Sequence, residues 1–385
     1  RDPYCVPVLL MPASLHHPRA QISHQGRSFR RGLRAWLGIC LGGALLCVNL
    51  AGCAPSPWDA AQTRYTDGLG RVLDISISST ELRALVAPVP PKAPVSPTAS
   101  QKQAPSQAAK AGTALPAPAS LNLLDYLRTT PCELHPLISE HNSSLGKFSS
   151  ATTRLVYDLK FINASDRCVT RLSASHPDLA RQIQDEADRK RAQLPNQLRA
   201  ALLYGPELSQ FWHRQNSLGL YPETLQSDLE PALKALRQQA NAIKTLRFTG
   251  TAAELDLALA ALRAAEGGLL LKGWMDVANQ MHAANAVIDA FLAKRPLCYG
   301  KKSNPRALQL KALVENLFIG QLQPMTATLN RRTHALLPLI EQLEDALNAQ
   351  EDPNYAAFIR ERADLIRTAR ARLVSHTERL QGLLA

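Results

Sequence analysis

The chain has 385 residues and a formal net charge of +12, and aromatic side chains make up 5% of it. The net charge falls to +7 when residues 1–52 are removed, because that segment holds six basic residues and one acidic residue. Nucleic-acid-binding proteins usually carry a basic stripe interleaved with aromatic residues, so this mild and scattered excess excludes nucleic acid as the expected partner.

The first segment, residues 1–52, is interpreted as a leader with a signal peptide, and residues 1–26 as an over-extended start. Basic residues precede an apolar run from Ala35 to Val48 that is too short to span a bilayer permanently. Leu50-Ala51-Gly52-Cys53 follows and resembles the lipobox of bacterial lipoproteins. The resemblance implies cleavage before Cys53 and acylation of that residue, although an uncleaved signal anchor is an alternative. Because the next residue is not aspartate, we expect a lipid-anchored protein of the cell envelope, on the outer membrane facing the periplasm.

Two segments separate the leader from the body. Residues 53–86 predict a lipidated tether with a short helix, because Tyr65, Leu69 and Val72 recur at helical spacing. Residues 87–118 contain eight prolines among Ala, Ser, Gln and Lys, which predicts a disordered linker rich in Pro and Ala. At roughly 3.1 Å per residue, such a linker would hold the body on the order of 100 Å from the point where it begins.

Residues 119–385 predict an all-α domain resembling a multi-helix bundle, because apolar residues recur with period 3.6 and no alternating strand pattern occurs. Thr251–Glu254 forms a capping box at a helix start. We expect Pro195 to start a helix and Gly267-Gly268 to separate two helices. The last three helices are predicted over residues 305–322, 324–348 and 353–381.

Three cysteines remain after the leader and Cys53 are set aside, namely Cys132, Cys168 and Cys298. In an oxidising compartment, one disulfide with one cysteine left over is expected. Helices on either side of Phe148 would be antiparallel neighbours, which favours a Cys132–Cys168 bridge, while the pairing among the three stays open. The cysteines show no zinc-ligand spacing, so we expect no metal and no cofactor.

The densest polar stretch runs from Cys132 to Lys147 and includes the candidate functional residues Glu133, Glu140, His141, Asn142 and Ser143. A hydrolase would need Ser143 as nucleophile beside a base such as His141. Neighbouring residues on a helix point about 100° apart, so Glu140 does not orient His141 by adjacency alone. No nucleophile elbow, metalloprotease motif or nucleotide-binding loop supports catalysis. The favoured interpretation is structural, with Asn142 and Ser143 bonding the end of a helix and Gly146 as its left-handed cap.

Several short motifs are similar to the DUF3080 family, whose members are helical lipoproteins of proteobacteria without an assigned function. The resemblance covers most of the chain from about Tyr65 and implies the fold and the envelope address, but no activity and no catalytic residue. The sequence departs from the family in its long linker and at His141, where an arginine is expected, which weakens His141 as a catalytic base. The matching segments are LDYLR (124–128), CEL (132–134), NSSLGK (142–147), Cys168, Cys298 and QLQP (321–324).

These observations favour a non-enzymatic lipoprotein, anchored to the membrane by acyl chains on Cys53, that docks an envelope protein or a cell-wall partner. One alternative is an envelope hydrolase that uses residues 140–144. Another is a carrier of an apolar ligand, for which Trp212, Trp274 and the Leu269–Leu271 run would line a cavity. An open apolar cavity would favour the carrier, and convergent polar side chains in a cleft would favour the hydrolase.

Overall fold

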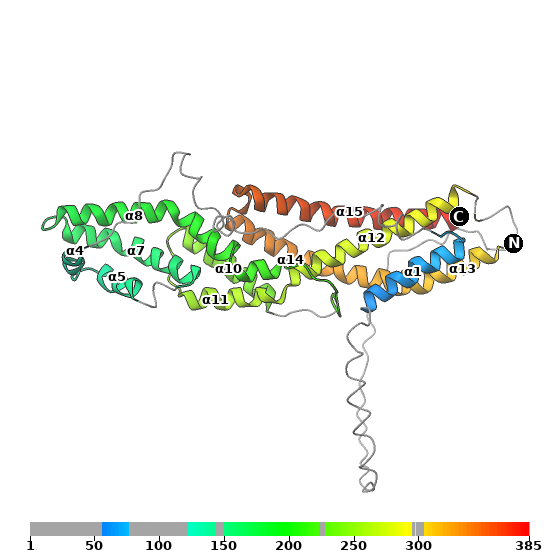
Figure 1. Ribbon diagram of the computed structural model, residues 1–385, viewed down its shortest axis with the longest axis horizontal. Coiled ribbons are helices and arrows are strands. Elements are labelled where there is room, and N and C mark those ends of the chain that lie inside the picture. The colour runs from blue at the N-terminus through cyan, green and yellow to red at the C-terminus, as the bar shows by residue number, and fades with distance from the viewer. Residues whose placement is uncertain are drawn as a thin grey trace, which may run out of the picture. The chain divides into compact units, whose positions relative to one another are not determined.

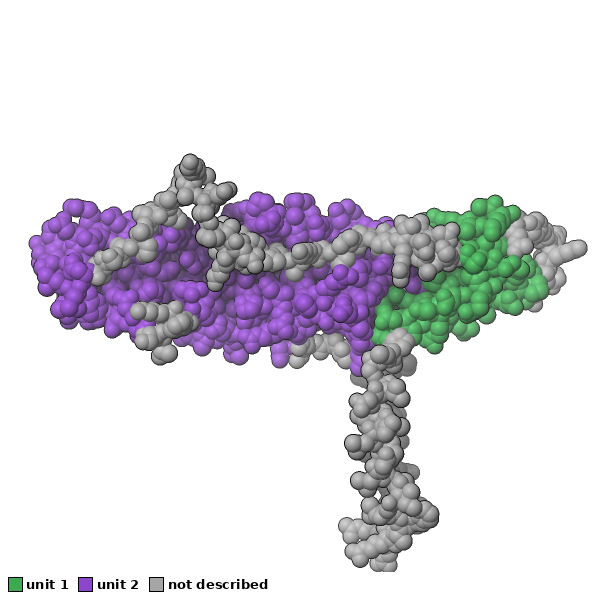
Figure 2. Space-filling view, in the orientation of Figure 1, with its two compact units in different colours: residues 1–79, 283–322, 375–385 green, residues 80–282, 323–374 purple. Residues whose placement is uncertain are grey.

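A computed structural model describes residues 56–76, 122–143, 149–222, 228–294, 297 and 304–384. The secondary structure within these ranges is helical, without a strand, which confirms the all-α prediction (Figure 1). In the described ranges, we find no helix with both the length and the hydropathy needed to cross a membrane. The chain divides into two compact units, shown in Figure 2.

Unit 1 is formed by three separate stretches of sequence, residues 1–79, 283–322 and 375–385. Its first helix, α1, contacts α13 and the π-helical segment η4. Gly68 permits this packing, because a Cβ atom at that position would lie 2.5 Å from Cδ1 of Leu313. The described helices of unit 1 are α1 (Pro57–Leu73), the end of α12 (Glu266–Leu292), α13 (Pro305–Leu313), η4 (Val314–Leu322) and the end of α15 (Pro353–Leu384).

Unit 2 comprises residues 80–282 and 323–374, so the division between the units falls within α12 and α15. The long helices α7 and α8 pack side by side in unit 2, and α5 packs against α7. Besides the first parts of α12 and α15, the described helices of unit 2 are α4 (Leu123–Arg128), α5 (Leu134–Asn142), α7 (Ala151–Leu172), α8 (Pro177–Leu198), η2 (Arg199–Leu203), α9 (Pro206–Phe211), α10 (Leu229–Lys244), α11 (Ala252–Ala260), η3 (Ala261–Ala264), α14 (Gln323–Ala346) and η5 (Ala349–Glu351).

The predicted capping box at the start of α11 is present in the structure. The Thr251 hydroxyl accepts from the backbone N–H of Glu254 at 3.3 Å, and the Glu254 carboxylate accepts from the N–H of Thr251 at 2.9 Å, which confirms the capping box. Of the last three predicted helices, the first is α13 continued by η4, and α15 runs three residues further than expected. The predicted break at residue 323 is wrong, because α14 follows η4 directly.

Two predicted breaks at helix-breaking residues are also wrong. Pro195 lies inside α8, near its end, and does not begin a helix. Gly267 and Gly268 lie in the first turn of α12. These glycines serve close packing, because a Cβ atom at Gly267 would lie 2.5 Å from the Phe211 ring and one at Gly268 would lie 1.8 Å from a backbone oxygen. The chain turns instead at Ala265, which has φ of 56°.

The helix predicted within residues 53–86 is present as α1, but it is not separate from the helical body. Tyr65 and Leu69 are fully buried in unit 1. Parts of the helical body predicted over residues 119–385 belong to both units. Spacing along the sequence identifies the buried face of α1, but it gives no information about the residues that cover this face. The predicted acylation site Cys53, the leader and the linker lie outside the described residues.

Candidate functional site

The candidate residues of the polar stretch lie at the end of α5, where this helix packs against α7. Glu140, His141 and Asn142 occupy the last turn of α5, and Ser143 follows as its C-cap. The His141 ring stacks on the Tyr157 ring of α7, with centroids 4.1 Å apart and an interplanar angle of 22°. Stacking therefore fixes the imidazole against an aromatic face.

Ser143 closes the helix, as the structural interpretation predicts. Its hydroxyl donates to the carbonyl oxygen of Glu140 at 2.7 Å, and its backbone N–H donates to the same oxygen at 3.2 Å. The expected role of Asn142 is wrong, because its side chain is exposed and makes no hydrogen bond in the described part of the chain. The Ser143 hydroxyl takes the free carbonyl that Asn142 was expected to help satisfy. The expected cap at Gly146 lies outside the described residues.

The start of α5 is attached to α7 by the expected disulfide. Cys132 and Cys168 are bonded, with their Cα atoms 5.2 Å apart. Both cysteines belong to a buried apolar cluster shared by α5, α7 and α8. Glu133, the remaining candidate, forms an exposed ion pair with Arg167 of α7. It therefore lies on the surface beside the disulfide and apart from the last turn of α5.

A pocket of about 570 Å³ opens between α5, α7 and α8. His141 and Asn142 lie at its α5 side, and Tyr157, Asp158 and Lys190 are among the residues that line it from α7 and α8. A neighbouring pocket of about 510 Å³ shares His141 and Tyr157 and is also lined by Glu140 and Ser143. The predicted candidates at residues 140–143 therefore surround two adjoining pockets.

The charged centre of the larger pocket is Lys190, whose residue is only 8% exposed. Its ammonium group donates to the Asp158 carboxylate and lies 3.5 Å from an oxygen of Glu186. The same nitrogen lies 5.0 Å from the centroid of the Tyr157 ring and 5.4 Å from that of Phe161, which adds cation–π attraction. The cation is thus paired with two carboxylates and packed against two aromatic rings.

The second pair of charges in this pocket is Arg189 and Glu186, both on α8, whose side chains form an ion pair. Burial alone would raise the pKa of Glu186, but the hydrogen bond from Arg189 and the charge of Lys190 outweigh burial and lower it. Burial, reinforced by the charges of Asp158 and Glu186, raises the pKa of Tyr157. Glu186 therefore stays ionised and Tyr157 stays protonated near neutral pH, so neither is suited to exchange a proton there.

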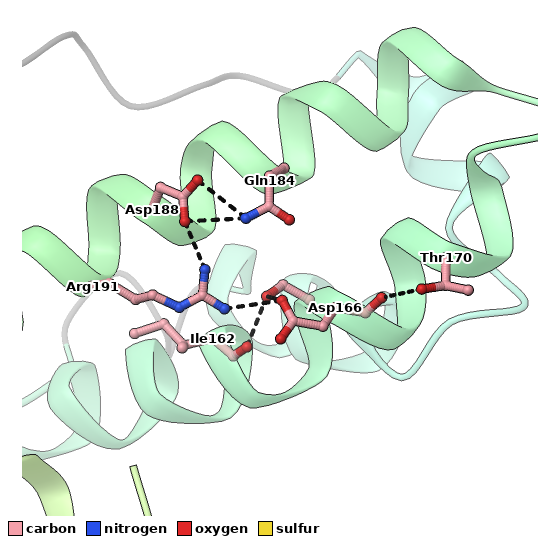
Figure 3. A network of polar contacts seen from close by, with 7 residues as sticks. Ile162, Asp166, Thr170, Gln184, Asp188 and Arg191 are labelled. Atoms are coloured by element: carbon pink, nitrogen blue, oxygen red, sulfur yellow. Dashed lines mark hydrogen bonds and ion pairs between the residues drawn. The ribbon is translucent and has the colours of Figure 1, made fainter. Parts of the chain in front are cut away.

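An exposed network joins the two helices that form the pocket walls. Arg191 of α8 reaches Asp188 on its own helix at 2.7 Å and Asp166 on α7 at 3.0 Å. Asp188 also accepts from the Gln184 amide at 3.1 Å, and Figure 3 shows these side chains between the helices. Because an ion pair on the surface contributes little by itself, this network mainly fixes how α7 and α8 are aligned.

Sequence reasoning missed the pocket charges. Lys190 lies within Asp188-Arg189-Lys190-Arg191, which as a sequence is only a charged block. Glu186 and Lys190 are four residues apart and therefore share one face of α8, a spacing that predicts an ion pair but not its burial. Its partner Asp158 lies 32 residues away on α7 and is placed there only by tertiary packing. Among the described residues, no group of three or more His, Cys, Asp or Glu side chains is arranged to hold a metal ion.

The residues proposed to line an apolar cavity lie elsewhere in unit 2, in its core. Trp212 is 3% exposed and packs edge-on against Phe211 and Phe358. Trp274 is 1% exposed, and its indole N–H donates to the Thr333 hydroxyl at 2.8 Å. Both tryptophans fill space between helices, and Leu270 and Leu271 of the predicted cavity-lining run are also buried.

Comparison with known proteins places most of the chain in a family. A protein-family model described as "Protein of unknown function (DUF3080)" matches residues 64–385. No curated protein matches the chain, and no solved structure matches it. The match covers α1 from residue 64 onward and all the later helices among the described residues.

Proposed function

Because the chain belongs to the DUF3080 family, which carries no assigned activity, its function has to be argued from its own residues, and we propose a non-catalytic docking protein of the cell envelope. In this proposal Cys53 is acylated, and the pocket between α5, α7 and α8 receives a polypeptide segment of an envelope partner. The acyl chains supply the membrane attachment, and the helical body supplies recognition.

One observation carries the proposal. The ionised groups at the centre of the pocket are paired with one another, with Lys190 between Asp158 and Glu186 and with Arg189 on Glu186. A hydrolytic site needs a base that is free to take a proton and a nucleophile beside it. A paired charge cluster with aromatic neighbours instead forms a rigid, preorganised surface, which lowers the cost of binding.

The rim of the pocket supports a polypeptide partner. Neutral amides of Asn142, Gln182 and Gln197 line it beside the exposed Arg154. Amides donate and accept hydrogen bonds, as a peptide backbone does, and arginine and tyrosine are enriched where protein interfaces are strongest. The pocket thus combines neutral amides and an arginine with the rings of Tyr157 and Phe161, which are residue types suited to a polypeptide partner.

A photocrosslinking experiment in intact cells tests the docking site. A benzophenone amino acid at Gln197 is expected to give a discrete adduct, and the matched substitution at exposed Gln238 on α10 none. Gln182→Trp, which blocks the rim without touching the charge pairs, should abolish the Gln197 adduct. An adduct that persists in Gln182→Trp, or that forms equally from Gln238, would contradict a partner in this pocket.

The hydrolase remains a second candidate because of one specific observation. Glu140, His141 and Ser143 line the same pocket of about 510 Å³. The Ser143 hydroxyl, however, donates its proton to the Glu140 carbonyl rather than to a base. Ser143→Ala separates the two functions, because docking tolerates this change and a serine hydrolase does not. A Ser143→Ala protein that is as stable as the unaltered protein but fails to complement a deletion of the gene would favour hydrolysis over docking.

A further inference from the structure

The helix that follows the acylation site is part of a folded core. In α1, Trp58, Tyr65, Leu69 and Leu73 are at most 1% exposed. They lie along one face of the helix, and this face packs on α13 and η4, which come more than two hundred residues later. Burying several large side chains makes this association strong, because the free energy gained rises with the apolar area removed from water.

Polar contacts specify how α1 is seated within unit 1. The Tyr65 hydroxyl lies 2.7 Å from Nε2 of His376, and Nδ1 of His376 lies 2.7 Å from the amide oxygen of Asn285. The Tyr65 ring stacks on Phe318 with centroids 5.5 Å apart. At the surface, Arg64 donates to the Gln321 side chain at 3.0 Å. These contacts join α1 to η4 and to the end of α15, and His376 extends the chain of hydrogen bonds to α12.

The acylation site is very close to this helix along the chain. Ser56 caps α1, with its hydroxyl accepting from the Asp59 N–H at 3.1 Å. Cys53 precedes Ser56 by three residues, which span at most about 10 Å even when fully extended. The Pro/Ala-rich segment 87–118 comes after α1, so it does not lie between the acylation site and unit 1.

We propose that α1 is the element that couples the lipid anchor to the body, and that segment 87–118 does not carry this attachment. The inference rests on the proposed acylation of Cys53. Unit 1 is then held directly against the lipid surface, within the reach of three residues. This replaces the sequence-based expectation that residues 87–118 hold the body on the order of 100 Å from the point where they begin. The linker then connects α1 to the later helices along the chain without carrying the anchor.

Site-specific cleavage of the full-length, membrane-inserted protein tests this inference. One version carries a tobacco etch virus protease site between Pro105 and Ser106, and a matched version carries it between Pro55 and Ser56. After complete cleavage in the linker, the fragment from Ser106 onward should stay in the membrane pellet. In the matched version, cleavage ahead of Ser56 should release the whole chain from Ser56 onward to the supernatant. Release by linker cleavage in the otherwise unchanged protein would overturn the inference.

Two variants in the linker-cleavable protein test whether α1 is responsible. Tyr65→Phe removes only the hydroxyl, and Gly68→Leu places a side chain against Leu313. We expect Gly68→Leu to release the fragment after cleavage and Tyr65→Phe to weaken retention, detected as faster loss during washing. Arg71→Ala, at an exposed position of α1, is the matched control and should retain the fragment fully. Retention by Gly68→Leu equal to that of Arg71→Ala would contradict the role of α1.

A second readout separates this inference from the proposed acylation. Uncut protein that fails to pellet with membranes would refute the lipid anchor alone. In detergent, an affinity tag placed directly before Ser56 should still recover the fragment from Ser106 onward after linker cleavage. Failure of that recovery would refute the packing of α1, whatever the state of Cys53.

Discussion

The Tyr65 hydroxyl and Nε2 of His376 lie 2.7 Å apart, although 311 positions separate the two residues in the sequence. Since Nδ1 of His376 faces the Asn285 amide oxygen at 2.7 Å, it carries the ring proton, and Nε2 accepts from Tyr65. A neutral imidazole satisfies both neighbours. Burial, with a smaller effect of the Arg379 charge, lowers the pKa of His376 to about 3.

The buried histidine predicts a loss of stability in mild acid. Unfolding returns the His376 pKa to its ordinary value of about 6.5, so the unfolded chain binds a proton below that pH while the folded chain does not. The contribution of this group is therefore constant above pH 6.5 and falls progressively toward pH 3. At pH 4.5 the loss amounts to about 3 kcal/mol. Hydrogen exchange of the α1 amides at pH 7 and pH 4.5 measures it.

Variants at two histidines check that prediction. His376→Gln keeps hydrogen-bonding groups but has no group that titrates. The difference in α1 amide protection between pH 7 and pH 4.5 should therefore become smaller, whatever the stability of the variant at pH 7. His334→Gln, at an exposed position on α14, should leave the acid sensitivity unchanged. Equal acid sensitivity in His376→Gln and in the unaltered protein would show that another group is responsible.

A predicted helix boundary is correct where the interacting residues are close together along the chain, and can be wrong where the interaction joins distant segments. The capping box Thr251–Glu254 is complete within four residues, so its sequence contains everything that the bond needs. Gly267 and Gly268 were misinterpreted because a glycine that ends a helix and a glycine that admits a neighbouring ring are identical in sequence. Only the approach of Phe211 distinguishes them.

Much of the candidate site depends on contacts between helices. The end of α5 could be identified from its polar residues, and Ser143 was correctly placed at the helix end. The ion pair of Lys190 with Asp158 required the packing of α8 on α7, which no local pattern encodes. The same holds for α1, because helical spacing identifies its buried face but not the helices that cover it.

Removing the Cys132–Cys168 bridge should destabilise unit 2. The disulfide closes a loop over a sequence separation of 36 residues. A loop of this length corresponds to about 3–4 kcal/mol of stability in the chain-entropy treatment. Urea unfolding of the Cys132→Ala/Cys168→Ala double variant measures the effect. Cys298→Ser is the control and should unfold like the unaltered protein, and a reductant should destabilise only proteins that retain the bridge.

Removing one partner of the buried Lys190–Asp158 ion pair should lower the stability of the protein more than replacing both partners with apolar residues. Lys190→Met leaves the carboxylate of Asp158 buried without its partner and should destabilise the protein by about 3–5 kcal/mol. Lys190→Met combined with Asp158→Leu removes both charges and should recover much of that loss. Lys234→Met breaks an exposed pair with Glu230 and should have little effect. Additive losses in the double variant would contradict direct coupling of Lys190 to Asp158.

The end of α5 provides the last prediction. Ser143→Ala removes a hydroxyl that donates to the Glu140 carbonyl at 2.7 Å, so the free energy of unfolding should fall by about 0.5–1.5 kcal/mol. Asn142→Ala removes an exposed amide and should change stability less, the reverse of the order expected from the sequence. Thermal melts of both variants measure the difference. A larger loss in Asn142→Ala would restore that residue as the helix-end group, because stability follows whichever side chain satisfies the last carbonyls of α5.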